Sequence, residues 1–300
     1  MDLSYAQRLE DYHLACAFGD QATGFYVDVG AGHPVADNVS YWFYLRGWHG
    51  LVVEPQPHLF SRYRGLRPRD MAVQSLVGRA TGEVDFHVFE GLHGLSTTLE
   101  HHARRAAETG ATYRTVRQNV TTLAALLEAH GVERIDFLKV DVEGAEGEVF
   151  AGMDWGRWRP RIIVAEAVVP NDVHQAAIEW EAALLRQDYR FALFDGLNRF
   201  YVAAEERDLL ARLPREPADW GVVRHLYEFG RVLENPQHPD RALALRLIAA
   251  FLAELPLLDE ARLRALLGEQ ASTENPSSDA LREAIGRIAA PYDGGLLLDD

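Results

Sequence analysis

Two short segments carry residues whose types and spacing suit the binding of a nucleoside-type cofactor. The first is Asp28-Val-Gly-Ala-Gly-His33, which follows an apolar run. Its glycines let the backbone approach a ligand, and amides at the start of a following helix would favour an anionic or carboxylate group. The second is Gly50-Leu-Val-Val-Glu54, whose terminal carboxylate can accept hydrogen bonds from both hydroxyls of a ribose. Together, at the ends of adjacent predicted strands, they indicate a nucleoside site.

The residues around the glycines distinguish between two cofactors. A nicotinamide site usually shows a third glycine, but residues 33–36 read His-Pro-Val-Ala. An oxidoreductase of that class also needs a Tyr-x-x-x-Lys-type proton donor, and the only lysine, Lys139, lacks that context. Asp28 stands two positions before the first glycine, where a carboxylate suits a cationic ammonium group and fits a pyrophosphate poorly. We therefore expect S-adenosylmethionine as cofactor and S-adenosylhomocysteine as product.

A second group of polar residues follows in Asp136-Phe-Leu-Lys-Val-Asp-Val-Glu-Gly-Ala-Glu146. Lys139 and Asp141 are two apart on a predicted strand and face the same side. Asp141 falls at its carboxyl end, where open α/β sheets bind ligands. Glu143 and Glu146 are predicted in the first turn of the next helix, three apart and so adjacent. The alternative is a charge pair followed by acidic residues that favour a helix N-terminus.

Oxygen ligands for a divalent cation could come from the same region. Asp141 and Glu166 end consecutive predicted strands, and Glu143 or Asn171 could complete the ligand set. Such a cation would orient and acidify an acceptor hydroxyl. The alternative for Glu166 is a hydrogen-bonded strand end that lines the acceptor pocket.

Transfer of a methyl group from such a cofactor to an acceptor that carries a proton requires removal of that proton near the transition state. Asp141 is the carboxylate expected nearest the methyl donor, with Lys139 beside it. His93, in the loop 91–98, and His33, just past the glycines, are the candidate histidine bases. We expect Asp141, His93 and Lys139 to be the catalytic residues.

The pattern of apolar residues predicts an α/β fold over residues 1–205. Strands alternate with helices, which implies a mostly parallel sheet with helices on both faces. A terminal hairpin, residues 189–203, predicts one antiparallel edge strand. The predicted strands are 24–30, 50–54, 70–77, 84–89, 135–141, 161–167, 189–194 and 200–203; the predicted helices are 4–18, 38–46, 57–63, 123–130, 143–151 and 173–186.

A C-terminal helical region is predicted over residues 206–300. Its apolar spacing indicates amphipathic helices, with a flexible link at 270–278. Three roles are open for it: a lid over the acceptor site, a homodimer interface, or docking to a neighbouring biosynthetic enzyme. The predicted helices are 220–233, 242–255, 260–267 and 280–289.

Composition excludes several classes of protein. The chain has 300 residues and a formal net charge of −15, which argues against a general nucleic-acid binder. We expect no membrane span, because the sequence lacks about 18 consecutive apolar residues. The N-terminus does not resemble a secretory signal, and one cysteine, Cys16, fits a reducing cytoplasm.

The sequence resembles the FkbM family of methyltransferases over roughly residues 4–204. The most specific stretch is Phe137-Leu-Lys-Val-Asp-Val-Glu-Gly-Ala-Glu146. The other matching stretches are Ser4–Gln7 with Glu10-Asp11, Gly24–Ala31 with Pro34, Gly47–Pro55, Gly94–Thr97, Arg159-Pro160 with Glu166, and Phe194–Val202.

This resemblance implies a Rossmann-like methyltransferase fold and transfer of a methyl group, usually to a hydroxyl of a sugar or natural product. It places Asp28 and the loop Gly30-Ala31-Gly32 at the methionine part of the cofactor and Glu54 at the ribose. Gln74 and Ser75 would border the adenine, although asparagine is commoner at the position of Gln74. Two alternatives remain: a metal-assisted methyltransferase acting on a small molecule, and a non-catalytic nucleoside-binding module.

Overall fold

The computed structural model describes residues 1–89, 93–108, 110–167, 178–229 and 232–267. Contacts between residues divide the chain into two units, Met1–His225 and Leu226–Asp300. The first unit contains the predicted cofactor residues and is described first. The predicted boundary at 205/206 lies twenty residues earlier and stays a prediction.

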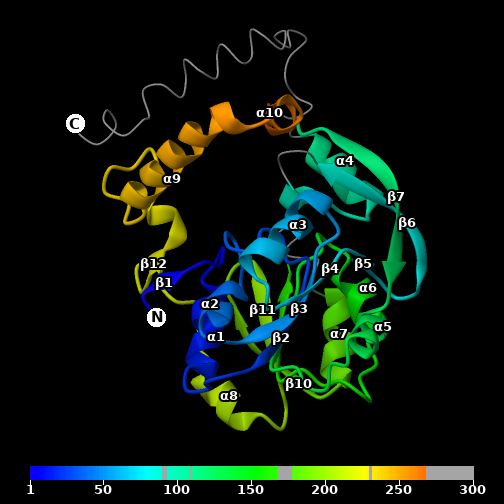
Figure 1. Ribbon diagram of the computed structural model, residues 1–300. Helices are drawn as coiled ribbons and strands as arrows, with labels where there is room; N and C mark the ends of the chain where they lie inside the picture. The colour runs from blue at the N-terminus through cyan, green and yellow to red at the C-terminus, as the bar shows by residue number, and fades with distance from the viewer. Residues whose placement is uncertain (90–92, 109, 168–177, 230–231, 268–300) are drawn as a thin grey trace. The chain divides into compact units, whose positions relative to one another are not determined.

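A mixed α/β architecture forms the first unit, around a central, mostly parallel sheet (Figure 1). Its described strands lie in the order β10-β11-β9-β8-β2-β3-β4; β9, β8, β2, β3 and β4 pair in parallel, and β11 is antiparallel to both β9 and β10. Their bounds are β2 Phe25–Val29, β3 His49–Val53, β4 Met71–Val73, β8 Phe137–Val140, β9 Ile162–Glu166, β10 Tyr189–Phe194 and β11 Asn198–Ala203.

Side chains of the central strands alternate between two apolar clusters, one on each face of the sheet. Val27 and Leu138 belong to one cluster, whereas Tyr26 and Phe137 belong to the other. Such burial on both faces explains why these strands read as continuous apolar runs in the sequence. It also places Asp28 and Lys139, which are paired in register, on the same face as Tyr26.

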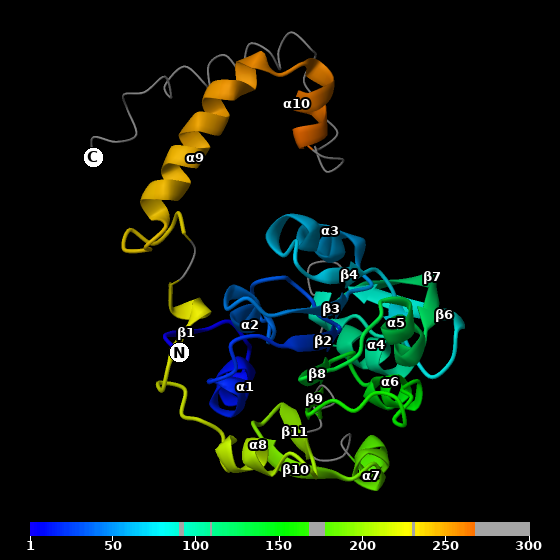
Figure 2. The ribbon, with the colours of Figure 1, turned by 60° about the horizontal axis from the view of Figure 1, so that its bottom comes forward.

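Helices cover both faces of the sheet, as Figures 1 and 2 show. Apolar side chains of α1, α2, α3 and α8 pack in one cluster, and those of α5, α6 and α7 in the other. The helices are α1 Glu10–Phe18, α2 Tyr41–Leu45, α3 Pro57–Leu66, α5 Leu123–Ala129, α6 Glu146–Ala151, α7 Ile178–Arg186 and α8 Arg207–Arg212. The predicted sheet and the predicted layers are confirmed at this level.

A second, three-stranded sheet was not predicted. The expected strand 70–77 is divided at Gln74 and Ser75 into β4 and β5 (Leu76–Val77), and β5 pairs in parallel with β7. β6 (Gly82–Phe89) pairs with β7 (Tyr113–Thr121) in antiparallel orientation, and α4 (Glu100–Ala107) lies between them in the sequence. The chain therefore leaves the main sheet immediately after β4.

The terminal hairpin is present, but its strands are placed differently from the prediction. β11 is the antiparallel strand, and it lies between β9 and β10 rather than at the edge. β10 occupies the edge because β11, the second strand of the hairpin, forms the ladder with β9.

The predicted helix 220–233 is wrong over its described part up to Phe229. Residues Arg224–His225 form a short strand, β12, parallel to β1 (Leu3–Ser4), and a 3₁₀ turn follows at Leu226–Phe229. The ring of Trp220 stacks on His225 at 4.8 Å between centroids. Pairing with the N-terminus therefore overrides the local helical pattern.

In the second unit, α9 (Arg241–Glu254) and α10 (Glu260–Leu267) agree with the predicted helices. The predicted helix 280–289 lies outside the described residues. No helix among the described residues is both long and apolar enough to cross a membrane.

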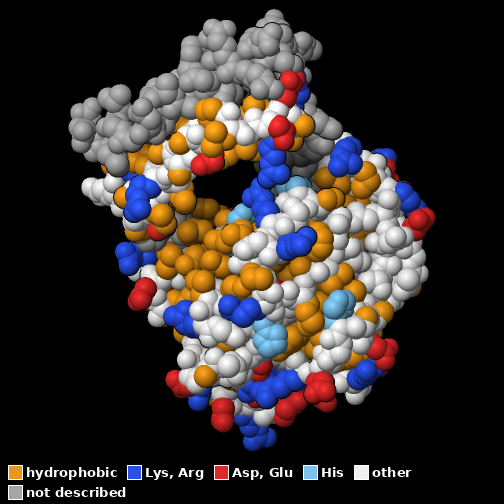
Figure 3. Space-filling model, in the orientation of Figure 1, with side chains coloured by type: hydrophobic (Ala, Val, Ile, Leu, Met, Phe, Trp, Pro, Cys, Tyr) orange, Lys and Arg blue, Asp and Glu red, His pale blue; other side chains and the backbone are white. Residues whose placement is uncertain are grey.

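On the face of the first unit that Figure 3 shows, acidic and basic side chains lie close to one another along the lower edge.

Candidate active site

A cavity of about 430 Å³ opens at the carboxyl ends of the central parallel strands. Val29 and Val53 line it from the ends of β2 and β3, and Asp141 lines it from just beyond β8. This end of a parallel sheet is where open α/β folds bind ligands. The volume lies in the range of small-molecule sites.

The glycine loop is held against β3 by its backbone. The amides of Gly30 and Ala31 both donate to the carbonyl of Val53, at 3.0 and 3.1 Å. Gly30 has φ = 75°, and a Cβ atom there would lie 1.7 Å from the backbone oxygen of Asp141. Only glycine fits this position, because both the backbone conformation and the space exclude a side chain.

The sequence led us to expect that the glycine loop runs directly into a helix, but it does not. α2 begins only at Tyr41, so the amides after Gly32 are not those of a helix start. Instead, Asn38 Nδ2 and the Tyr63 hydroxyl donate to the carbonyl of Ala31, at 2.9 and 3.1 Å. Side chains therefore shape the loop.

Glu54 connects the glycine loop to the end of β3. Its Oε2 accepts from the amide of Gly32 at 2.8 Å, and its Oε1 accepts from the amide of Gln56 at 2.8 Å. The residue is 3% exposed but lines the cavity, and burial raises the pKa of its carboxyl to about 7. Each carboxylate oxygen keeps a lone pair for a ligand hydroxyl.

Asp28 lies deeper than its sequence position suggested. It is 1% exposed, and its Oδ2 accepts from the Ser40 hydroxyl at 2.6 Å. Its Oδ1 lies 3.9 Å from Lys139 Nζ and has no hydrogen-bond partner among the described residues. Asp28 is not among the described residues that line the cavity. A direct contact of Asp28 with the cofactor stays a prediction.

Lys139 connects three groups at the base of the cavity. Its Nζ lies 2.9 Å from Asp141 Oδ2 and donates to the carbonyl of Gly30 at 3.2 Å. Burial alone would lower the pKa of this amine, but the carboxylates of Asp141 and Asp28 raise it above its ordinary value. These carboxylates therefore favour the charged form of the Lys139 amine, and its catalytic role stays a prediction.

The segment between β8 and α6 is a loop and not the helical turn that was predicted. Glu143 has φ = 55° and Gly144 has φ = 96°, which no helix accommodates. Glu146, the first residue of α6, accepts with one oxygen from the amides of Val142 and Gly144, both at 3.1 Å. The predicted helical turn over Glu143 is thus wrong, since α6 begins only at Glu146, but the charge of Glu146 still contributes to the raised pKa of Glu143.

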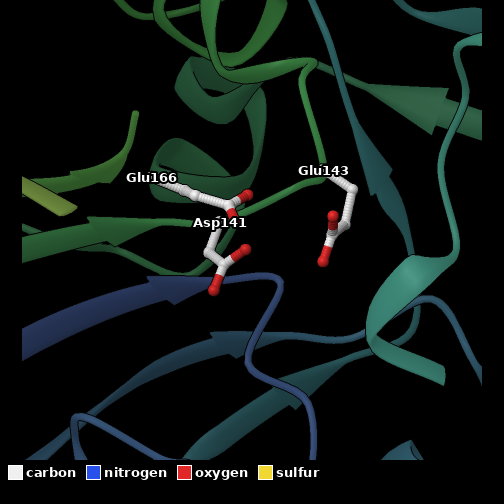
Figure 4. A group of neighbouring side chains, drawn as sticks. All are labelled: Asp141, Glu143 and Glu166. Atoms are coloured by element: carbon white, nitrogen blue, oxygen red, sulfur yellow. The ribbon is translucent and has the colours of Figure 1, made fainter. Parts of the chain in front are cut away.

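Three carboxyl groups converge beside this loop (Figure 4). Asp141, Glu143 and Glu166 each offer one oxygen, and these oxygens all lie within 4.8 Å of one another. Burial, followed by the neighbouring charge of Asp141, raises the pKa values of Glu143 and Glu166 well above their ordinary values. The sequence had grouped these three residues; the fourth candidate, Asn171, lies outside the described residues.

The two candidate histidines differ in what the structure describes. His33 lines the cavity, but its Nδ1 accepts from the amides of Val35 and Ala36, both at 3.1 Å. Nδ1 therefore acts as an acceptor within the loop, and a role of His33 as a base stays a prediction. His93 begins the short turn His93–Leu95, and its side chain is not among those described. Its catalytic role stays a prediction.

The wall opposite the strand ends is largely apolar. Leu76, Val77 and Phe86 line it from the three-stranded sheet, and Ser75 lines it beside them. Gln74 is exposed and donates to the carbonyl of Pro55 at 3.3 Å. Sequence reasoning missed Phe86 because the strand that carries it was not assigned to the site; its alternation with Val84 and Val88 was the available signal.

Comparison with known proteins bears on the region that builds this cavity. The family model of the methyltransferase FkbM domain matches residues 28–191, which is more than half of the chain. The match begins at Asp28 and includes Glu54, Lys139, Asp141 and Glu166. No curated protein matches the chain significantly.

Proposed function

The chain belongs to the methyltransferase FkbM family, and we propose that it transfers a methyl group from S-adenosylmethionine to a hydroxyl oxygen of a sugar, a glycan or a natural product. The observation that carries this proposal is the junction between the glycine loop and Glu54. There the buried carboxylate of Glu54 and the backbone of Gly30 and Gly32 border the same cavity of about 430 Å³. The hydroxyl acceptor rests on the family resemblance.

The residues of the cavity fit this cofactor. A Cβ atom at Gly32 would meet nothing within 4 Å, so the glycine leaves open space beside the cavity. In this proposal Gly30, Ala31 and Gly32 hold the methionine part, and Glu54 accepts from the ribose hydroxyls. Ser75 and the apolar wall border the adenine, and Gln74 lies farther out. When bound, S-adenosylmethionine supplies a methyl group made electrophilic by its positively charged sulfur.

The cationic end of the cofactor needs negative charge nearby. Asp28 provides it from behind the loop, and its Oδ1 accepts no hydrogen bond from the described residues. Lys139 lies between Asp28 and Asp141, and its positive charge offsets part of their negative charge. We assign Lys139 the role of a positioning residue that fixes Asp141.

Asp141 is the group that we assign to the acceptor. Both Asp141 and Lys139 line the cavity, but the side chain of Asp141 is 27% exposed and that of Lys139 only 7%. Its carboxylate would orient the acceptor hydroxyl and take its proton as the new bond to the methyl group forms. Alignment contributes up to about 7–11 kcal/mol and a general base about 10²–10⁴-fold. His93 remains the second candidate base.

Thermal stability in the presence of ligands tests the cofactor. At a hundredfold excess over its Kd, a ligand stabilises the folded state by about 2.7 kcal/mol. We expect S-adenosylhomocysteine to raise the melting temperature by several degrees and NAD to leave it unchanged. The Glu54→Gln variant should show a much smaller shift, whereas Glu128→Gln, an exposed control, should respond like the original chain. A shift with NAD alone would contradict the proposal and favour an oxidoreductase.

Transfer itself is tested with a labelled methyl donor and a panel of sugars, glycans and hydroxylated natural products. We expect mass spectrometry to locate the label on an oxygen atom of one acceptor class. Asp141→Asn should lower turnover by about 10²-fold or more, and His93→Ala shows whether that histidine takes part. Label found only on nitrogen would reject the O-methyl assignment, and bound cofactor without transfer to any acceptor would favour a non-catalytic module.

A further inference from the structure

The carboxyl groups of Asp141, Glu143 and Glu166 pose an electrostatic problem that the proposed methyl transfer does not explain. Their oxygens lie within 4.8 Å of one another. Lys139 is paired with one oxygen of Asp141, at 2.9 Å, and thereby offsets one of these charges. Like charges at such separations repel strongly where water is scarce. A group of this kind is costly unless its members take up protons or share a positive charge.

Glu166 gives an independent indication of a missing partner. It is 9% exposed, and its Oε2 is buried without a hydrogen-bond partner among the described residues. Asn198, its partner in the β11 ladder, has its side-chain amide directed to Glu10 Oε1 at 2.6 Å. Figure 4 shows the carboxyl group of Glu166 turned toward that of Asp141. A buried, unsatisfied carboxylate oxygen requires an explanation, and a bound ion is one of the few available.

The spacing suits one cation held by all three groups. Ligand oxygens on opposite sides of an ion are about two bond lengths apart, roughly 4.2 Å for Mg²⁺ and about 4.6–5.2 Å for Ca²⁺. The observed upper limit of 4.8 Å falls within this range. Carboxylate oxygens are hard ligands, which select Mg²⁺, Mn²⁺ or Ca²⁺ over softer metals.

Contacts to the backbone of the loop after β8 fix the position of Glu143. Glu143 adopts a left-handed backbone conformation that is unfavourable for its residue type. The Thr97 hydroxyl donates to its carbonyl at 2.9 Å, and Glu146 binds the amides on either side. Backbone strain that is retained by such contacts is characteristic of functional sites.

We propose that Asp141, Glu143 and Glu166 bind a single hard divalent cation at the edge of the cavity. Asp141 and Glu143 also line the cavity, so the ion would be reachable by an acceptor. The role of the ion rests on the proposed methyl transfer. An acceptor hydroxyl bound to it is acidified and loses its proton to a carboxylate of the group, as the oxygen–methyl bond forms and the sulfur–methyl bond breaks.

Binding of Mn²⁺ to the full chain tests the site without any assay of activity. After removal of metals with a chelator, we expect electron paramagnetic resonance and calorimetry to show one Mn²⁺ per chain, displaced by excess Mg²⁺ or Ca²⁺. Glu166→Gln and Glu143→Gln should each weaken binding by at least about tenfold. Glu128→Gln changes the net charge equally at an exposed position outside the group of three carboxylates and should bind Mn²⁺ like the original chain.

The outcomes separate this proposal from the proposed function. No binding of Mn²⁺ at millimolar concentration, or equal binding by Glu166→Gln and the original chain, overturns the cation site. If S-adenosylhomocysteine still stabilises the chain in that case, the methyltransferase proposal stands alone. Cation binding without any response to S-adenosylhomocysteine would instead retain the metal site and reject the cofactor. The melting temperature of each variant without ligands shows whether it is folded.

Discussion

Gly30 is the residue whose replacement the cavity tolerates least. Its positive φ is shared with Gly47, but only at Gly30 would a Cβ atom meet backbone, 1.7 Å from the Asp141 oxygen. At Gly47 the same atom would meet nothing within 4 Å. The two positions therefore separate the effect of backbone conformation from the effect of close approach.

We predict that Gly30→Ala costs much more stability than Gly47→Ala. The strain of a left-handed alanine is about 1–2 kcal/mol in both variants, and the clash at Gly30 adds to it because β2 and β8 must separate. Urea denaturation of the two variants, together with thermal shifts by S-adenosylhomocysteine, measures the difference. If both variants lose the same stability and both still bind the ligand, the backbones at Gly30 and Asp141 do not approach each other closely.

At this scale the sequence predicted the positions of the site residues better than their surroundings. Gly30, Gly32 and Glu54 could be placed because they directly follow or end apolar strands. The burial of Asp28 and the use of His33 Nδ1 by two amides could not, because they depend on a loop closed by distant side chains. Periodicity reports the face of a strand, but not the depth of a residue behind a loop.

Arg67, the residue after α3, connects several elements of the first unit. Its guanidinium donates to Asp70 at 2.7 Å, to the hydroxyls of Tyr26 and Ser40, both at 2.9 Å, and to Asn38 at 2.8 Å. Arg67 and Asp70 both have side chains that are 0% exposed. The position of α3 against β2 and the loop after Gly32 thus depends on one buried cation.

We predict that Arg67→Met destabilises the chain by about 3–5 kcal/mol, because it leaves Asp70 buried without its charged partner. The control is Arg104→Met, which removes an exposed pair with Glu100 and should not shift the melting temperature measurably. Calorimetry and chemical denaturation provide the values. If the two variants have the same stability, the buried network does not hold these elements together.

Elements were predictable where their apolar pattern was strong. β2, β3, β8 and β9 agree with the predicted strands because both of their faces are buried. β7, by contrast, reads Tyr-Arg-Thr-Val-Arg-Gln-Asn-Val-Thr, and most of its side chains are partly or fully exposed. Such a strand carries little signal, and its pairing with β5 and β6 depends on contacts that are distant in the sequence.

At the scale of the whole molecule, buried acids near the N-terminus make stability depend on pH. Glu10 Oε1 accepts from Asn198 Nδ2 at 2.6 Å, and Asp195 lies beside it. Burial, with a contribution from Asp195, raises the pKa of Glu10 from 4.5 to about 8. Between these two values the folded chain holds a proton that the unfolded chain has released, so raising the pH favours unfolding.

We predict that the free energy of unfolding falls as the pH rises from 6.5 to 8. Glu10 alone contributes up to about 1.4 kcal/mol per pH unit in this window. Glu10→Gln should flatten the dependence. Burial lowers the pKa of His13 from 6.5 to about 4. Below pH 6.5 the unfolded chain therefore binds a proton at His13 that the folded chain does not, and this contribution lowers the free energy of unfolding as the pH falls. Denaturation curves at several pH values test this, and an unchanged slope in Glu10→Gln would reject the assignment to Glu10.

Two truncations test the organisation into units. A chain ending at His225 keeps β12, its pairing with β1 and the hydrogen bond from the Ala218 amide to His13 Nε2. A chain ending at residue 205 lacks all of them, although it follows the predicted boundary. We predict that the longer chain folds and binds S-adenosylhomocysteine, and that the shorter one melts at a lower temperature. Equal melting temperatures would favour the boundary at 205/206.

The role of the second unit stays a prediction. α9 exposes Leu243, Leu247 and Phe251 to solvent among the described residues, which is compatible with association with a second copy or with a biosynthetic enzyme. The sequence could not predict that residues 220–229 belong to two elements rather than one helix. That outcome depends on β1, which lies more than two hundred residues away.

The position of β2 at the centre of the sheet has a consequence for synthesis of the chain on the ribosome. One edge of β2 pairs soon with β3, but the other must wait for β8, since Phe25 and its partner Asp136 are 111 residues apart. At about 5–20 residues per second, this edge stays open for roughly 6–22 s in each nascent molecule. For that time a mostly apolar strand presents unpaired amides and carbonyls, and a chaperone that shields it would protect the chain from aggregation.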